Sequence, residues 1–295
     1  MKKSALITIA GRPNVGKSTL TNLLVGEKIA IVSNKPQTTR NRICGVLTRG
    51  ETQLVFMDTP GFHKPRTKLG DYMVNVVEAS VADVDATFLM VEPIANIGIQ
   101  EEELIKQIKA SRAPSVLVIN KIDSVEKEQL LEVIAVYSQA HDFDAIIPIS
   151  AKTGEGVEEL LNEAERFAIE APHFFPDDVT SDQPERQVMA EIIREKLLWC
   201  LEREIPHGTA VEITRFTERD NGIIDMDATI YCEKASHKGI IIGKHGDMLK
   251  KISSMARIDC EKFMGTKVFL QTWVKVKENW RDNVNYVRSF GYNDD

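Results

Sequence analysis

A glycine-rich segment near the start of the chain has the residue types and spacing of a phosphate-binding loop. The match to GxxxxGK[ST] is complete, and it lies between an expected strand and an expected helix. Its glycines let backbone N–H groups point inward, and the following helix start adds positive potential. We expect Lys17 to contact the β- and γ-phosphates and the Ser18 hydroxyl to ligate Mg²⁺. A glycine-rich turn with a chance lysine is the alternative, expected in roughly 1% of chains this long. The nucleotide-binding residues predicted here are Gly11, Arg12, Pro13, Asn14, Val15, Gly16, Lys17, Ser18 and Thr19.

A second motif, Asp58-Thr59-Pro60-Gly61, follows an apolar strand. The Asp58 carboxylate should therefore emerge at the carboxyl end of that strand, where open α/β sheets bind ligands, and hold Mg²⁺ through water. The Gly61 amide can contact a γ-phosphate, which only a triphosphate offers. Alone, DTPG would be an ordinary turn, but its place after a phosphate loop favours the binding site.

Two further motifs favour guanine over adenine. Asn120-Lys121-Ile122-Asp123 ends an apolar strand, and an aspartate there can accept hydrogen bonds from guanine N1–H and the 2-amino group. Adenine would leave that carboxylate unpaired. Ser150-Ala151-Lys152 follows the next strand, where the Ala151 amide could bond guanine O6. GTP and GDP are thus the expected substrate and product.

The polar segment VSNKPQTTRNR offers Thr38 and Thr39 as further ligands of Mg²⁺, beside Ser18 and Asp58. The sequence does not decide between the two threonines, although Thr39 is preferred. Ras-type enzymes have a water-orienting glutamine directly after DxxG, and Phe62 stands there instead, so unaided hydrolysis should be slow. His63 is a weaker candidate base, since a lone loop histidine is usually solvated.

The pattern of elements predicts two domains, with an α/β GTPase domain at residues 1–170, a linker at 171–185 and a second domain with a tail at 186–295. In the first domain, short β-branched runs alternate with helical patterns, which is typical of a mostly parallel sheet with helices on both faces. Strands are expected at 4–10, 43–49, 52–58, 85–91, 115–120 and 145–149, and helices at 17–26, 71–80, 99–111, 126–140 and 156–170. Residues 171–185 have three prolines and no periodicity, which predicts the linker.

The second domain has the order αββααβ, with GKHG between its two adjacent helices. This is the setting of the KH loop, which clamps about four unpaired nucleotides, and αββααβ is the type II KH order. The expected RNA-binding residues are Gly243, Lys244, His245, Gly246, Lys238 and Lys250. Trp199 and Trp273 lie on periodic faces and are expected in the core, whereas Trp280 and Tyr286 could pack on RNA or on the domain.

Composition limits the remaining classes. The chain has 295 residues, 43% of them apolar and 27% charged, which is the range of a globular protein. Its four cysteines form no CxxC pair, which argues against a zinc cluster or a disulfide framework. No apolar run is long enough to span a bilayer, and the first residues predict a strand rather than a signal peptide. The net charge of -7 is uneven: residues 1–185 carry -8 and 186–295 carry +1, with five lysines in 234–251.

With these motifs in order, the first 170 residues resemble the translation-factor-related GTPases, and nearly the whole chain resembles the Era family. The matching segments are GRPNVGKST, QTTR, DTPG, NKID, ISAKTGEGV, IIREKL, GIIIGKHG and WVKVKENW. The resemblance implies an N-terminal GTPase domain and a C-terminal KH domain that binds the single-stranded 3′ end of small-subunit ribosomal RNA and assists maturation of the small ribosomal subunit. It implies catalytic roles for Lys17, Thr39, Gly61 and Asn14. Asn14 either helps to hold K⁺ beside the nucleotide or only forms a turn in the loop.

Two rival functions stay open at this point. The chain could be a constitutive RNA-binding module that uses the nucleotide only for stability, or a signalling GTPase with a protein or membrane target. We expect a cytoplasmic monomer, with peripheral contact to the inner face of the cell membrane left open. Comparing RNA affinity in the presence of a GTP analogue with that in the presence of GDP tests the first rival function. Ribosome cosedimentation tests the second.

Overall fold

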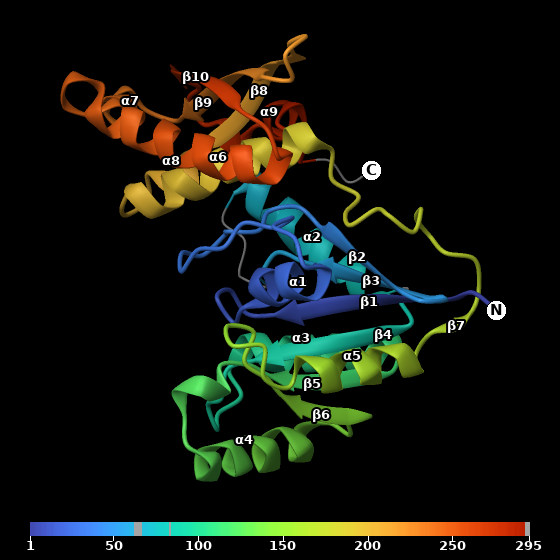
Figure 1. Ribbon diagram of the computed structural model, residues 1–295. Helices are drawn as coiled ribbons and strands as arrows, with labels where there is room; N and C mark the ends of the chain where they lie inside the picture. Colours follow the sequence, from blue (N-terminus) through green and yellow to red (C-terminus); the bar gives the residue numbers. More distant parts are fainter. Residues whose placement is uncertain (62–66, 83, 293–295) are drawn as a thin grey trace. The chain divides into compact units, whose positions relative to one another are not determined.

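The chain divides into two compact units (Figure 1). The structure, a computed structural model, describes residues 1–61, 67–82 and 84–292. The first unit holds most of residues 1–182. The second begins at Gln183 and also contains Ile31–Thr38 and a short stretch at the start of α2 (Lys68–Ala82). Residues 31–38, expected in the first domain, thus cluster with the second.

The first unit is built on a seven-stranded sheet with the order β2-β3-β1-β4-β5-β6 and β7 paired to β1. Parallel pairing joins β3, β1, β4, β5 and β6, whereas β2 runs antiparallel to β3. The mostly parallel α/β class is therefore confirmed. The strands are β1 (Lys3–Gly11), β2 (Ile43–Arg49), β3 (Thr52–Asp58), β4 (Ala86–Val91), β5 (Ser115–Ile119), β6 (Ala145–Pro148) and β7 (Ile169–Glu170).

Helices cover both faces of this sheet, and each face has its own apolar cluster. Leu20 of α1 (Lys17–Val25) and Leu160 of α5 (Val157–Arg166) pack in one cluster. Residues of α2, α3 (Ile99–Ser111) and α4 (Lys127–Ala140) form the other. Burial on both faces explains why the parallel strands are almost continuously apolar. The phosphate loop and the Asp58, Asn120 and Ser150 motifs all follow carboxyl ends of parallel strands, so the fold brings them to one edge.

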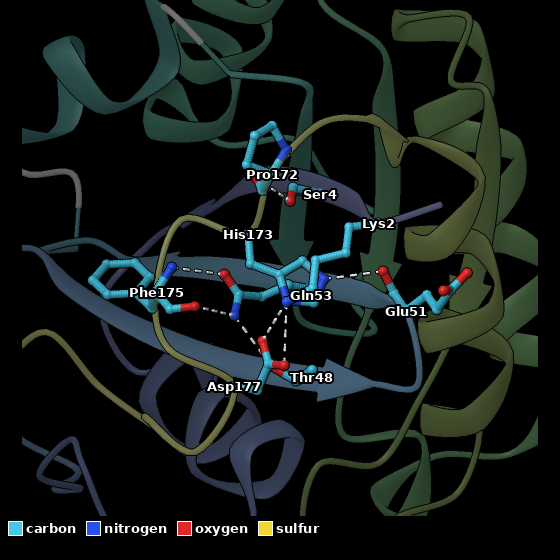
Figure 2. Close-up of polar contacts among 9 residues, drawn as sticks. All are labelled: Lys2, Ser4, Thr48, Glu51, Gln53, Pro172, His173, Phe175 and Asp177. Carbon is cyan, nitrogen blue, oxygen red and sulfur yellow. Dashed lines mark hydrogen bonds and ion pairs between the residues drawn. The ribbon is translucent and has the colours of Figure 1, made fainter.

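Most of the expected linker is fixed to the first unit. Gln53 of β3 exchanges two hydrogen bonds with Phe175, of 2.9 and 3.0 Å, and Asp177 lies 3.2 Å from the Lys2 ammonium (Figure 2). Val46 N donates to Thr180 O at 2.9 Å, beside a bridge between Gly45 and Ser181. Residues 171–182, here called the strap, thereby satisfy the open edge of β2. The helix expected to reach residue 170 ends at Arg166, because β7 follows it.

The second unit has the expected order of elements. They are α6 (Glu185–Cys200), β8 (Ala210–Glu218), β9 (Ile224–Cys232), α7 (Ala235–Ile242), α8 (Asp247–Met264) and β10 (Val268–Val276). The sheet order is β10-β9-β8, with β9 antiparallel to β8 and parallel to β10. Among the described residues, this unit also has the 3-10 helices η2 (Pro206–Gly208), η3 (Lys244–Gly246) and η4 (Trp280–Asp282), whereas η1 (Ile122–Ser124) belongs to the first unit.

The tryptophans differ from expectation. Trp199 is 50% exposed and Trp273 is 45% exposed, so neither is a core residue. Trp273 alternates with the buried Val274 along β10 and therefore faces away from the core. Trp280 is fully buried, donates from Nε1 to Gly208 O at 2.9 Å and contacts the Phe290 ring. The tail thus packs on its own unit through α9 (Val284–Ser289), a helix that was not predicted.

Candidate functional site

Lys17 lies folded back into its own loop. Its ammonium donates to Gly11 O at 3.1 Å and to Arg12 O at 3.0 Å, and the side chain is buried. Burial lowers the pKa of Lys17 from 10.5 to about 8, an effect that the nearby Asp58 carboxylate partly opposes. A phosphate group would supply the negative charge that this buried ammonium otherwise lacks.

Ser18, Thr39 and Asp58 form a cluster of oxygen atoms beside the loop. Ser18 Oγ donates to Asp58 Oδ2 at 2.6 Å, and the Ser18 and Thr39 hydroxyl oxygens are 2.8 Å apart. Asp58 is fully buried, which raises the pKa of its carboxyl group, against the opposing effect of the Lys17 charge. Among the described residues, Asp58 Oδ1 has no hydrogen-bond partner. Two hydroxyls around a buried carboxylate with a spare oxygen fit Mg²⁺, which prefers oxygen ligands.

The two threonine candidates are separated by the geometry. Thr38 Oγ1 donates to Lys35 O at 2.6 Å, within its own segment, whereas Thr39 is buried beside Ser18 and 3.4 Å from Asp58 Oδ2. Of the two, Thr39 is the one whose hydroxyl lies in the oxygen cluster with Ser18 and Asp58.

The guanine motifs meet through Asn120. Its Nδ2 donates to Val15 O at 2.7 Å, and its Oδ1 accepts from Ala151 N at 2.9 Å. Asn120 therefore ties the phosphate loop to the Ser150 loop. The Ala151 amide, expected to bond guanine O6, donates to Asn120 here, and its contact with guanine stays a prediction.

Asp123, the residue predicted to recognise guanine, is oriented by the Ser150 loop. Its Oδ1 accepts from Ser150 Oγ at 2.8 Å, and the Lys152 ammonium lies 3.9 Å from Oδ2. The Asp123 side chain is one quarter exposed, so the carboxylate is oriented by Ser150 and still accessible. Lys152 is largely exposed.

Close approach explains three of the glycines. A Cβ at Gly11 would lie 2.4 Å from Met90 O, and one at Gly61 would lie 2.7 Å from Pro13. At Gly16, where φ is +108°, a Cβ would lie 2.3 Å from Asn120 Nδ2. Thr59 is buried and donates to Ile9 O at 3.0 Å, which anchors the start of the DTPG segment, and Pro60 is buried after it.

Two glutamates support the loop and were not predicted. The buried Glu101 pairs with Arg12 Nε at 2.5 Å, and Glu92 lies 3.2 Å from Arg12 and 2.5 Å from Lys121 Nζ. Lys121 also donates to Asn14 O at 2.8 Å, so Arg12 and Lys121 link the phosphate loop to neighbouring segments, while their contact with nucleotide stays a prediction. Asn14 itself is exposed with φ +66°. Phe62 and His63 lie outside the described residues.

The loop Gly243–Gly246 joins α7 to α8 in the second unit. Gly243, His245 and Gly246 have positive φ values of 75°, 54° and 85°. Lys244, His245 and Lys250 are exposed, and Lys238 is half-buried on α7. The sharp turn therefore presents positive side chains at the start of α8, where backbone N–H groups favour a phosphate.

Among the helices that the structure describes, none is long and apolar enough to cross a membrane. Within the same residues, no group of three or more His, Cys, Asp or Glu side chains could hold a metal ion.

Comparisons with known proteins agree with this arrangement. A family model for a 50S ribosome-binding GTPase matches residues 6–121, and a KH domain model matches residues 204–281. The GTPase Era of Ruminiclostridium cellulolyticum is 52% identical, over 98% of this chain and 97% of that protein. The GTPase Era of Clostridium kluyveri is 50% identical over 99% of this chain and all of that protein.

Two solved structures match almost end to end at 36% identity. A variant of Aquifex aeolicus Era bound to GDP·AlF4⁻ has a TM-score of 0.94 and covers 98% of this chain and 99% of that one. Era in complex with MgGDPNP and nucleotides 1506–1542 of 16S ribosomal RNA has a TM-score of 0.95 and covers 99% of each chain. The phosphate loop, the guanine motifs and the KH loop all fall within these matches, and the chain therefore belongs to the Era family and is a GTPase.

Proposed function

We propose that this GTPase binds the single-stranded 3′ end of small-subunit ribosomal RNA through Gly243–Gly246 and assists maturation of the small ribosomal subunit. The observation that carries the proposal is the match over 99% of the chain to Era bound to nucleotides 1506–1542 of 16S ribosomal RNA. The exposed Lys244 and His245 on a positive-φ turn supply the matching local geometry. RNA backbone can approach this turn closely because Gly246 has no neighbouring atom within 4 Å of a Cβ position.

In the nucleotide site, we assign phosphate contacts to Lys17 and to the loop amides, and metal ligation to Ser18 and Thr39, with Asp58 behind them. Mg²⁺ bound there would neutralise charge on the β- and γ-phosphates. The Lys17 ammonium would leave the carbonyls of Gly11 and Arg12 for phosphate oxygens. The Gly61 amide would contact only a γ-phosphate, so the segments around Thr39 and Gly61 would distinguish GTP from GDP.

We also propose that Asn14 helps to hold K⁺ beside the nucleotide. The position after DxxG is Phe62, which cannot orient water, so another group must complete the site. Asn14 is exposed and has a left-handed backbone, and glycine tolerates that backbone. K⁺ should stimulate GTP hydrolysis by the parent protein more than Na⁺ does, and Asn14→Gly should remove that difference. An undiminished K⁺ effect in this variant would exclude the Asn14 role.

The test of RNA binding uses one position and two side chains of the same shape. Gly246→Asp adds a negative charge where the phosphate approaches, and Gly246→Asn adds a neutral side chain that tolerates the same positive φ. Both can serve as the N-cap of α8, so folding should be equal. Gly243 is a poorer choice, because a Cβ there would lie 2.7 Å from Met248 Cβ.

We expect Gly246→Asp to weaken binding of a labelled 3′-end RNA much more than Gly246→Asn, with GDP affinity unchanged in both. The difference in RNA affinity between the two variants should become smaller as the salt concentration rises. If the folded aspartate variant binds this RNA as the parent does, the assignment of the loop fails.

Equal RNA affinity with GDP and with GDPNP would support the rival function in which the nucleotide is only a structural ligand. A fraction bound to small subunits at low salt would argue against a protein or membrane target.

A further inference from the structure

Residues Ile31–Thr38, between α1 and β2 in sequence, are bound along α6 within the second compact unit. The backbone of Val32 is paired on both sides. Val32 N donates to Glu195 Oε1 at 2.8 Å, and Trp199 Nε1 donates to Val32 O at 3.0 Å. The half-exposed Trp199 thus has a polar partner on this segment, which explains why it is not in the core.

Lys35 holds the segment to the carboxyl end of the same helix. Its ammonium donates to the carbonyl oxygens of Leu198 and Leu201. Carbonyls at a helix C-terminus lack intrahelical partners, and a cation there is favourable. The middle of the segment is therefore fixed at a position that only the end of α6 provides.

Arg194 binds the C-terminal end of the segment. Its guanidinium donates to the carbonyl of Thr38 and, at 3.4 Å, to that of Gln37, while Nε donates to Glu191 Oε1 at 2.8 Å. The Arg194 side chain is fully buried. A buried guanidinium with its fork paired to Glu191 is rigid, so it can impose a geometry on the two carbonyls.

The turn at Gln37–Thr38, which Arg194 binds, is strained and is followed directly by Thr39. Gln37 has φ +58°, a left-handed conformation that glutamine rarely adopts. The Thr38 carbonyl belongs to the peptide bond with Thr39, whose Oγ1 lies 2.8 Å from Ser18 Oγ. Rotation of that turn would move Thr39, so a contact that holds the turn also holds Thr39.

We propose that Arg194 is a positioning residue of the GTPase, which holds the strained turn at Gln37–Thr38 and so keeps Thr39 at the metal site. The inference deepens the proposed function and rests on the assignment of Thr39 as a metal ligand. It makes the preference for a triphosphate over a diphosphate depend on a helix of the RNA-binding unit. Glu195 and Trp199 support Arg194 by holding Val32.

The test compares Arg194→Gln with Arg194→Lys and with Arg186→Gln in the full chain. Arg186 lies on the same helix, but it is exposed and donates to Phe216 O, outside the segment. Affinities for GDP and for GDPNP are titrated at saturating and at limiting Mg²⁺. Arg194→Gln should lower the ratio of GDPNP to GDP affinity about tenfold and raise the Mg²⁺ concentration that GDPNP binding needs, because charged hydrogen bonds are lost.

The expected GDP affinity of Arg194→Gln is unchanged, which a general loss of structure would not produce. Arg194→Lys should restore part of the ratio, and Arg186→Gln should leave it unchanged. A folded Arg194→Gln variant with the parent ratio and the parent Mg²⁺ dependence overturns the proposal.

A second pair of variants covers the case in which a buried arginine cannot be replaced. Trp199→Phe removes only the donor to Val32 O, and Trp273→Phe is the matched change at another half-exposed tryptophan. We expect a two- to threefold loss of the GDPNP to GDP ratio in the first, on the order of one neutral hydrogen bond, and none in the second. An unchanged ratio in Trp199→Phe, where Arg194→Gln does not fold, counts against the proposal.

Thr39→Ala separates this inference from the proposed function. If Thr39→Ala keeps the Mg²⁺-dependent preference for GDPNP, the metal role assigned to Thr39 fails, and the positioning role of Arg194 fails with it, whereas the proposed RNA binding is unaffected. If Thr39→Ala loses that preference while the folded Arg194→Gln variant keeps it, only the positioning role of Arg194 fails.

Discussion

Replacing Asn120 should disrupt nucleotide binding through the protein's own loops rather than through the base. Asn120→Ala removes the donor to Val15 O and the acceptor from Ala151 N, both of them buried backbone groups. Each unpaired buried group costs about 1–3 kcal/mol. Water that enters the space left by the amide can bond these groups, so the cost should lie near the lower end of this range. A total of about 2–3 kcal/mol corresponds to a GDP affinity that is about 30- to 160-fold weaker.

Asn120→Asp sharpens this test, because it keeps the shape and reverses one hydrogen-bond role. One oxygen can still accept from Ala151 N, but the other then faces Val15 O across the present 2.7 Å contact, as acceptor against acceptor. The aspartate variant should therefore bind GDP no better than the alanine variant, although it is closer in shape to asparagine. Asn96→Ala, at an exposed loop position of the same unit, is the control. Calorimetric titration with GDP gives the affinities, and parent-like binding by Asn120→Asp would refute the reasoning.

Three further results are expected. GDP affinity should fall about tenfold from pH 7 to pH 9. Phosphate binding favours the charged form of Lys17, whose pKa without nucleotide is about 8, and that form is lost as the pH rises through this value. A GDP affinity that does not change with pH would contradict this. Asp123→Asn should favour XDP over GDP by about tenfold or more in a competition assay, since the amide offers a donor where guanine needs an acceptor, and a retained preference for GDP would remove Asp123 from base recognition. Gln53→Leu should speed amide hydrogen exchange in residues 171–182, because two hydrogen bonds to Phe175 are lost, while RNA affinity stays the same; parent-like protection would show that other contacts hold the strap.

The succession of strands along the chain and the positions of the motifs could be predicted, because both are local properties of the sequence. Apolar runs such as the one before Asp58 are short, lie between turn residues and end in a polar motif, which is typical of parallel strands in an α/β fold. The carboxyl ends of such strands meet at one edge, so the site followed from the strands without knowledge of any contact. The KH loop was recognised in the same way, from two glycines between two helical patterns.

The contacts that the sequence did not reveal join residues far apart in the chain. Asn120 resembles a base-binding residue by its place in NKxD, but its amide is used by Val15 and Ala151, 105 and 31 residues away. The prolines of the strap correctly indicated irregular backbone, yet irregular backbone can still dock on a sheet edge through side chains such as Gln53. Periodicity placed Trp199 in the core, because it cannot show that an indole N–H has a carbonyl partner at Val32.

Residues 31–38 show why a boundary drawn along the sequence can differ from one drawn by contacts. By sequence they belong to the nucleotide-binding domain, since Thr39 follows them directly. By contacts they belong with α6, because Lys35 and Arg194 bind them there. If Arg194 positions Thr39 as proposed, the segment is continuous with a metal ligand and also bound to α6. The ordering of Thr39 by Mg²⁺ and GTP and the packing of the segment on α6 would then be thermodynamically linked, so that a change in one is accompanied by a reciprocal change in the other.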